Sequence, residues 1–221
     1  MTRKGAPLLK ADFHIHTRYS MDCHNEPEEV IERCQELGFT CVAISDHDAT
    51  EGAFRIKELA PFKVIVAEEI LTPAGEIMGM FLKERIASGL SVERAIDAIR
   101  AQGGLVALPH PFDPLRGLRL TTEALEKVMP RVDIIEVFNA RCHLPGSNRR
   151  ARDFARKHGL PGTAGSDAHT IPEMGGTYVE IPDFNTPQEF LQALGKARIN
   201  GKASSPFVHL HSTWAKIKKK L

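Results

Sequence analysis

Two histidines and an aspartate stand close together near the start of the chain, in the segment ADFHIHTRYSMDC. His14 and His16 end a short apolar run, and Asp22 follows six positions after the second histidine. Alternate side chains of an extended strand share one face, so both imidazoles should point the same way while Ile15 turns into the other layer. Two imidazoles on one face form half of a metal site.

Further potential metal ligands end later apolar runs, each at the C-terminal end of a predicted strand. With the first three they make eight donors: His14, His16, Asp22, His47, Glu69, His110, Asp167 and His169. Neutral imidazole and carboxylate together suit Zn, Mn and Fe. Eight donors are too many for one ion, and with a bridging carboxylate they fit two or three ions. Burying such a set without a cation would be costly.

A purely structural role is the alternative for each of these residues taken singly. A strand-end histidine is commonly a satisfied, partly buried residue. The segment SDHD could be a turn in which Asp46 or Asp48 bonds its own backbone, and GSDAH could be an Asx turn. However, five of the ten histidines end successive predicted strands beside an acid. This joint placement favours a multinuclear metal site.

Apolar runs that alternate with amphipathic helical patterns would position these residues. The predicted strands are ADFHI, TCVAIS, KVIVA, LVALP, DIIEVF, PGTA and TYVEI, with IMGMFL as an appended eighth strand. The predicted helices span residues 26–37, 50–60, 91–102, 148–158 and 187–197, with Ser91 and Thr186 as caps.

Seven units of a strand followed by a helix predict an α/β fold with a parallel sheet, either closed into a barrel or open and doubly wound. The strand ends decide between them. In a barrel they form one rim around one pocket, whereas an open sheet would spread the donors along an edge. We therefore expect a barrel.

Length, charge and cysteine content limit the remaining possibilities. The 221 residues, 42% of them hydrophobic, suffice for one substantial core, so one domain is expected. The balance of 29 Lys+Arg against 28 Asp+Glu indicates neither a nucleic-acid-binding nor a membrane-surface protein. Four cysteines without a CxxC pair, and no signal-peptide-like apolar run at the start, predict a reducing, cytoplasmic setting.

The segments DFHIHT, AISDHD, VIVAEEI, LPHPFD and TAGSDAH, in this order and spacing, resemble the motifs of the PHP (polymerase and histidinol phosphatase) domain family. The resemblance covers a motif core of about residues 11–181. It implies one PHP-type metallohydrolase domain over residues 1–221, with a C-terminal helical and strand extension at 182–221. It further implies a distorted (β/α)7, TIM-like barrel, two or three divalent ions (Mn, Zn or Fe) and phosphoesterase chemistry.

The resemblance also implies which donors share an ion. The first ion would be held by His14, His16 and Asp167, the second by His110 together with a bridging Glu69, and the third by Asp22, His47 and His169. Asn139 stands where some relatives place a further histidine on the second ion, so we expect it to be a weaker ligand there.

Four acidic residues near the ligands have open roles. Asp12 and Asp46 could each orient a histidine by accepting its distal N–H. Asp48 could cap the following helix instead. Glu76 lies near a position where some branches carry a histidine. It could ligate, hydrogen-bond or face solvent, and solvent exposure is the favoured interpretation.

The chemistry expected of such a cluster is hydrolysis by hydroxide attack on phosphorus, because bound divalent ions lower the pKa of water and neutralise phosphoryl oxygens. The candidate catalytic side chains, where not fully committed to metal, are His47, His169 and Asp22. Arginines pair with phosphate in two places at once. The candidate substrate-binding arginines, all in predicted rim loops, are Arg18, Arg116 and Arg141.

The predicted substrate is a small phosphomonoester or a short nucleotide phosphodiester. No long insertion caps the pocket, and aromatic residues are few, which argues against a long single-strand channel. We therefore expect neither a stable nucleic-acid complex nor a membrane partner. Two alternatives remain: a metallohydrolase acting on a non-phosphate bond, and a non-catalytic metal-stabilised binding domain. The full donor set disfavours the second, because a structural metal site closes with about four ligands.

Overall fold

The computed structural model describes residues 7–114, 119–144 and 146–205. Within these residues nine strands form one sheet, in the order β7-β6-β5-β4-β3-β2-β1-β8-β9. The strands are β1 (Leu9–Ile15), β2 (Cys41–Ile44), β3 (Lys63–Thr72), β4 (Gly75–Met80), β5 (Leu105–Leu108), β6 (Ile134–Asn139), β7 (Gly162–Gly165), β8 (Thr177–Ile181) and β9 (Arg198–Gly201).

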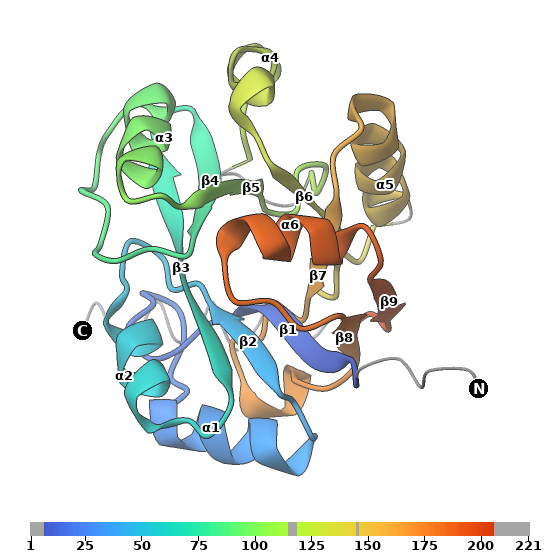
Figure 1. Cartoon of the computed structure of the whole chain (residues 1–221). Helices are drawn as coiled ribbons and strands as arrows, with labels where there is room; N and C mark the ends of the chain where they lie inside the picture. The colour runs from blue at the N-terminus through green and yellow to red at the C-terminus, as the bar shows by residue number, and fades with distance from the viewer. Residues whose placement is uncertain (1–6, 115–118, 145, 206–221) are drawn as a thin grey trace.

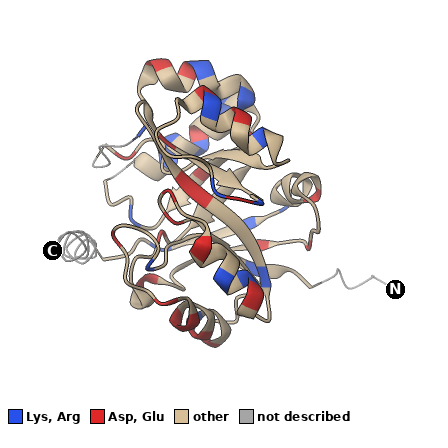
Figure 2. Ribbon diagram, turned by 90° about the vertical axis from the view of Figure 1, so that its left-hand side faces the viewer, with Lys and Arg blue, Asp and Glu red and all other residues tan. Residues whose placement is uncertain are grey.

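The helices of the described residues lie around this sheet (Figure 1). They are α1 (Pro27–Glu36), α2 (Glu51–Leu59), α3 (Val92–Ala101), α4 (Thr122–Val128), α5 (Ser147–His158) and α6 (Pro187–Leu194), with 3-10 turns η1 (Met129–Arg131) and η2 (Ile171–Glu173). Most charged residues lie on the helices and loops (Figure 2). The predicted caps are confirmed: Ser91 accepts the N–H of Arg94 at 3.4 Å and Thr186 that of Glu189 at 3.1 Å.

The sheet curls into a nearly closed barrel because the segment after β7 meets β1. The backbone N–H of Asp167 donates to the carbonyl of His14 at 2.8 Å, and that of His16 donates to Ala168 at 3.1 Å. The approach is so close that a Cβ at Gly165 would lie 2.2 Å from the Cβ of His14. Only glycine fits there. The mixed α/β barrel expected from the strand ends is confirmed, and the open sheet is not formed.

The strand directions depart from a simple repeat of strand and helix. β1, β2 and β3 pair in parallel, as do β5, β6 and β7. β4, expected as an appended strand, lies inside the sheet and runs antiparallel to both β3 and β5. β8 runs antiparallel to β1 and carries β9 at the edge. The short elements α4 and β9 were not predicted, because each offers too little periodic pattern to recognise.

The apolar core has two layers, one between the strands and the outer helices and one inside the barrel. Ile15 belongs to the outer layer and Phe13 to the inner layer. Helix α6 covers one mouth of the barrel, where the ring of Phe190 lies 5.1 Å from that of Phe13 and 5.3 Å from that of Phe81. This mouth is therefore filled with aromatic side chains.

Candidate metal centre

Four polar atoms from β1, β3 and the segment after β7 meet at the opposite mouth. The Nε2 atoms of His14 and His16 are 3.1 Å apart, and each lies 3.2 Å from Oε2 of Glu69. Oδ1 of Asp167 is 3.6 Å from His14 Nε2 and 3.3 Å from His16 Nε2. Four ligands at about 2.0–2.1 Å around a tetrahedral zinc ion stand roughly 3.4 Å from one another. Each of the two acids thus lies near this spacing from both histidine nitrogens.

Local backbone irregularities direct these side chains into the mouth. The pairing of β1 with β2 shifts register between Asp12 and Ile15. His110 and Asp167 adopt left-handed backbone conformations, with φ of 27° and 55°. Such conformations are energetically unfavourable for non-glycine residues, and residues that adopt them cluster at functional sites. Two of the predicted ligands therefore have strained backbones.

A second group of donors shares Glu69. Its Oε1 atom lies 2.9 Å from Nε2 of His110, so the two Glu69 oxygens face different partners. Glu76 is buried, at 4% exposure, with Oε2 3.9 Å from His110 Nε2. The expectation that Glu76 faces solvent is wrong, because the antiparallel direction of β4 brings the start of this strand to the polar mouth.

The third group surrounds Asp22, in the loop after β1. Its Oδ1 atom lies 3.2 Å from Nε2 of His169, and its Oδ2 atom lies 3.7 Å from Nε2 of His47. The ring of His16 stands 4.1 Å from that of His169. All eight predicted donors therefore lie in one buried cluster, in overlapping sets whose ligand atoms are within 4.8 Å of one another.

The charges of the cluster suit cations. Burial lowers the pKa of the His14 and His16 imidazoles, but Glu69 and Asp167 outweigh burial and hold the pKa of His14 well above its usual value and that of His16 at about 9. These acids therefore attract positive charge to the first position. Burial lowers the pKa of His47 to about 4 and that of His169 to about 3, so both imidazoles are neutral near neutral pH, as ligation requires.

Sequence reasoning missed two residues that orient ligands. Glu136, on β6, has Oε1 3.0 Å from Nδ1 of His14, while its Oε2 accepts the backbone N–H of His110 at 2.7 Å. Ser20 Oγ lies 2.9 Å from Nδ1 of His16. A lone glutamate in the apolar run IIEVF was the signal for Glu136. Ser20 carries no such signal in its loop.

The orienting roles considered for Asp12 and Asp46 are not formed. Asp12 accepts the backbone N–H groups of His14 and Ser166, at 3.1 and 3.0 Å. Asp46 accepts both the backbone N–H and the hydroxyl of Thr17 at 2.6 Å. The shift in β1 turns Asp12 away from the histidine face. These acids stabilise loops rather than imidazoles.

Asp48 and Asn139 contact groups around the cluster. Asp48 accepts the backbone N–H of Leu71 at 3.0 Å, and it does not cap α2. The Asn139 amide donates to Glu136 at 3.0 Å and to Asp167 at 3.1 Å, while its oxygen accepts the N–H of Arg141 at 2.9 Å. Asn139 thus contacts two carboxylates at the cluster, and its role as a weaker metal ligand stays a prediction.

The candidate substrate-binding arginines occupy different surroundings. The side chain of Arg18 is 52% exposed and pairs with Glu26 at 3.2 Å. Arg141 is buried, with Nη1 2.6 Å from His169 Nδ1 and Nε 3.3 Å from Glu173 Oε2. Arg116 lies outside the described residues. Of the two candidate arginines that the structure describes, Arg18 is exposed and Arg141 is buried.

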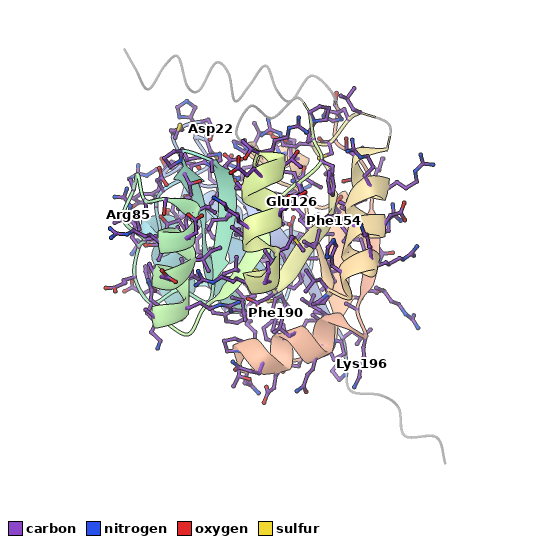
Figure 3. All side chains as sticks on the ribbon, turned by 90° about the horizontal axis from the view of Figure 1, so that it is seen from above. Asp22, Arg85, Glu126, Phe154, Phe190 and Lys196 are labelled. Atoms are coloured by element: carbon purple, nitrogen blue, oxygen red, sulfur yellow. The ribbon has the colours of Figure 1, made fainter. Side chains whose placement is uncertain are left out.

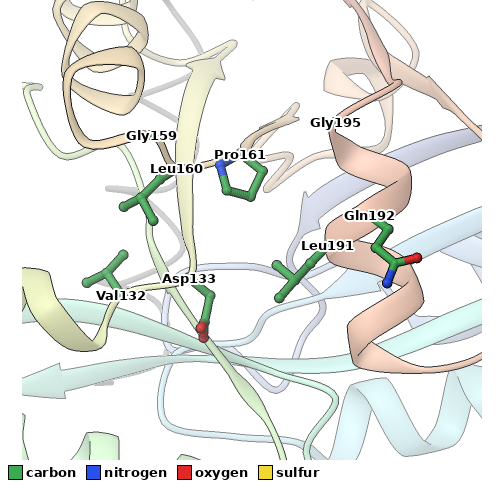
Figure 4. A pocket seen from close by; sticks show the side chains of 8 residues that line it. All are labelled: Val132, Asp133, Gly159, Leu160, Pro161, Leu191, Gln192 and Gly195. Atoms are coloured by element: carbon green, nitrogen blue, oxygen red, sulfur yellow. The ribbon is translucent and has the colours of Figure 1, made fainter.

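A separate hollow of about 600 Å³ lies at the starts of β6 and β7 beside α6, away from the metal ligands (Figure 4). Its lining is mostly apolar, with Leu160 and Leu191 facing each other across it. The Asp133 carboxylate there is already paired with Arg100 at 2.7 Å. This hollow holds none of the predicted ligands.

The barrel thus gathers imidazoles and carboxylates from five strands, β1, β2, β3, β5 and β7, in groups that could hold metal ions. Family models match the chain as PHP domain over residues 12–137 and as PHP-associated over residues 145–199. The first match covers more than half of the 221 residues. The chain belongs to the PHP domain family.

Known proteins of similar sequence or structure agree with this family. The uncharacterized protein MJ0417 of Methanocaldococcus jannaschii is 36% identical over 197 residues, 84% of this chain and 79% of that protein. A two-domain protein from Bacteroides vulgatus, containing a predicted PHP-like metal-dependent phosphoesterase, shares the fold with a TM-score of 0.73 at 19% identity, over 90% of this chain and 66% of that chain.

Endonuclease Q, solved with a 27-mer duplex carrying an abasic lesion, shares the fold with a TM-score of 0.61 at 15% identity. That alignment covers 86% of this chain and 57% of endonuclease Q. In the part of the chain that the structure describes, no helix has the length and apolar character needed to cross a membrane.

Proposed function

We propose that the protein is a metal-dependent phosphoesterase that hydrolyses a small phosphomonoester or a short nucleotide phosphodiester. The observation that carries this proposal is that Glu69 Oε2 and Asp167 Oδ1 each lie 3.2–3.6 Å from the Nε2 atoms of His14 and His16, with all four residues fully buried. The Glu69 oxygen has no hydrogen-bond partner among the described residues, so a cation there offsets its burial.

Three positions would hold ions in this proposal. The first uses His14, His16, Glu69 and Asp167, the second uses Glu69 and His110, and the third uses Asp22, His47 and His169. Divalent ions held there would make water nucleophilic near neutral pH and would neutralise phosphoryl oxygens. Mn, Zn and Fe all suit this donor set.

The protein's own side chains hold and orient these groups. Glu136 fixes the ring of His14 through Nδ1, which leaves Nε2 directed into the mouth. Arg18, at the exposed edge of the loop that carries Asp22, would bind a phosphate oxygen of the substrate. The carbonyl of Asp167, 2.9 Å from His169 Nδ1, would accept its N–H and leave Nε2 for the ion, while Arg141 pairs with the buried Glu173 beside this ring.

The test is hydrolysis by the full chain after chelation and dialysis, with Mn²⁺, Zn²⁺ or Fe²⁺ added back. The panel contains p-nitrophenyl phosphate, its bis-ester, nucleotides, a short oligonucleotide and p-nitrophenyl acetate. The oligonucleotide is included because the fold is shared with endonuclease Q. We expect metal-dependent turnover of at least one phosphoester and loss of it in Asp167→Asn.

The matched control is Asp153→Asn, which removes the same charge from the exposed face of α5 and should keep full activity. Turnover of the acetate alone would favour a metallohydrolase of another bond. A fully metallated protein that turns over no substrate would instead indicate a metal-stabilised binding domain. Either result contradicts the proposal.

A further inference from the structure

We propose that Glu76 is a ligand of a carboxylate-rich metal position, shared with Glu69 and His110, and that this position favours Mn²⁺ over Zn²⁺ more than the histidine-rich first position does. The inference rests on the metal centre proposed above and adds a ligand to it. None of the sequence motifs that predicted the centre contains Glu76. Its assignment comes from the direction of β4 and from the distances at the mouth.

The direction of β4 brings Glu76 to the metal centre. Along β3 the inner face of the barrel carries Ile65 and Ala67 and then reaches Glu69 at the polar mouth. β4 runs the opposite way, so Met80 and Met78 occupy its inner face and Glu76, near its start, comes last. Both inner faces therefore change from apolar to acidic at the same end of the barrel.

The turn before Glu76 is tightly held, which fixes where its side chain begins. The hydroxyl of Thr72 donates to the carbonyl of Gly75 at 2.6 Å, and the N–H of Thr121 donates to the carbonyl of Ala74 at 3.1 Å. A Cβ at Gly75, whose φ is +129°, would lie 2.4 Å from the backbone nitrogen of Leu120. The Glu76 backbone therefore has little freedom to move away from the mouth.

The distances from Glu76 to two histidines suit ligation better than hydrogen bonding. Its Oε1 lies 3.7 Å from His47 Nδ1, and its Oε2 lies 3.9 Å from His110 Nε2. Both separations are too long for hydrogen bonds. Two ligands at about 2.1–2.2 Å from one ion can stand up to about 4.3 Å apart. An ion between Glu69, Glu76 and His110 could accept one donor from each, because their ligand atoms lie within 4.8 Å of one another.

A second, independent observation points to the same space. Nδ1 of His47 is buried, has no hydrogen-bond partner among the described residues, and lies 3.5 Å from Glu69 Oε2 and 3.7 Å from Glu76 Oε1. Glu76 also lines a small hollow with Leu108 and Leu120. The carboxylates of Glu69 and Glu76 and this buried nitrogen therefore face one space.

The ligand types set the preference of this position. Two carboxylates and one imidazole are a harder donor set than the neighbouring position, where His14 and His16 supply two imidazoles. Carboxylate-rich sites favour Mn²⁺ relative to sites rich in imidazole, which suit Zn²⁺. The centre is therefore expected to bind different metals at adjacent positions.

The experiment measures Mn²⁺ binding to the chelated full chain, by loss of the EPR signal of free Mn²⁺, and compares wild type, Glu76→Gln and Glu126→Gln. Glu126 is an exposed residue of α4 (Figure 3) and serves as the matched control for charge. We expect Glu76→Gln to lose one Mn²⁺ or to bind it at least about 10-fold more weakly. Zn²⁺ bound at the first position, measured by metal analysis, should be unchanged in both variants.

Equal Mn²⁺ number and affinity in wild type and Glu76→Gln would overturn the inference while leaving the phosphoesterase proposal intact. A wild type that binds no divalent ion would overturn both. Should Glu76→Gln fail to fold, as judged by circular dichroism, Glu76→His provides the second test. It is expected to keep the ion number and to shift the preference towards Zn²⁺, and an unchanged preference would count against the assignment.

Discussion

The two mouths of the barrel are built by the same strands but differ completely in chemistry. One is filled by aromatic side chains under α6, where the ring centroids of Phe190 and Phe184 are 4.8 Å apart. The other gathers buried imidazoles and carboxylates, with His14 and His16 only 3.1 Å apart at Nε2. Figure 3 shows Asp22 and Phe190 at opposite ends of the barrel. Stability and chemistry are thus separated along one axis.

The contrast between the two mouths shows how the barrel can hold a cluster of buried charges that is unfavourable for folding. Apolar burial at one end contributes about 25 cal/mol for each Å² removed from water. At the other end, buried charge stabilises only when it is paired or bound to metal. The apolar mouth can therefore hold the strands in place while the polar mouth keeps an arrangement that is unfavourable without cations.

The largest expected effect comes from Glu69→Gln at the polar mouth. Glu69 faces His14, His16 and His110, so its loss disrupts two metal positions at once. Metal-assisted stabilisation of a transition state amounts to several kcal/mol, so we expect the phosphoesterase rate to fall by at least about 10³. If Glu69→Gln kept more than about a tenth of the wild-type phosphoesterase rate, the polar mouth would not be the site of the reaction. Glu126→Gln, assayed beside it, should keep the wild-type rate.

Phe190→Ala tests the apolar mouth. Phe190 is fully buried at 0% exposure, and its truncation should lower the free energy of unfolding by about 3–5 kcal/mol. Denaturant unfolding of the metal-free protein measures this. Metal bound per folded chain should not change. Phe54→Ala, at a residue 37% exposed, should cost less than about 1 kcal/mol. Equal losses in the two variants would contradict the assignment.

Glu136→Gln sharpens the comparison at the boundary between the two regions. The carboxylate contacts His14 through one oxygen and the backbone of His110 through the other. Removing such a partner of a ligand typically weakens metal affinity by about 10–100-fold. Competition with a chelator measures the affinity. A lower Tm with unchanged metal affinity would mean that Glu136 supports only the fold.

The smallest effect concerns Glu68, whose carboxylate lies outside the three ligand groups although Glu69 is its neighbour in β3. Burial raises its pKa from 4.5 to about 7. Because the pKa of the folded state exceeds that of the unfolded state, the folded protein binds this proton more tightly. Glu68 therefore destabilises the fold progressively as the pH rises from about 4.5 to about 7, and the loss persists above that range.

Glu68→Gln removes this dependence while its amide oxygen can still accept the N–H of Ile86, now bonded at 2.9 Å. We expect Tm to rise by about 2–4 °C near pH 8 and to stay close to wild type near pH 5, measured by calorimetry. A shift of the same size at both pH values would exclude titration of Glu68 as the cause. Glu84→Gln, at an exposed residue, is the control.

The sequence allowed prediction of the features that follow short-range rules. The alternation of His14 and His16 about Ile15 follows from the period of a strand, and the outer-layer position of Ile15 agrees with it. Caps at Ser91 and Thr186 follow from local hydrogen bonding. The convergence of donors at one mouth required the further assumption of a closed barrel, which the contact between β1 and the segment after β7 provides.

The features that could not be predicted depend on strand direction and register. Glu76 was expected in solvent because its strand seemed separate from the parallel repeat, and reversal of β4 brings it to the mouth. Asp12 was considered as a partner of a histidine ring because regular alternation was assumed, and beside the register shift in β1 it accepts the backbone N–H of His14 instead. A single sequence carries little information on either irregularity.

The most direct test of the account is the position of bound metal. Crystals of the full chain loaded with Mn²⁺ and Zn²⁺ would be measured at the absorption edges of both metals. The account predicts anomalous peaks inside the polar mouth, including one within about 2.0–2.3 Å of His14, His16 and Asp167. Fully loaded crystals with no anomalous peak in that mouth, or with metal only at other sites, would contradict it.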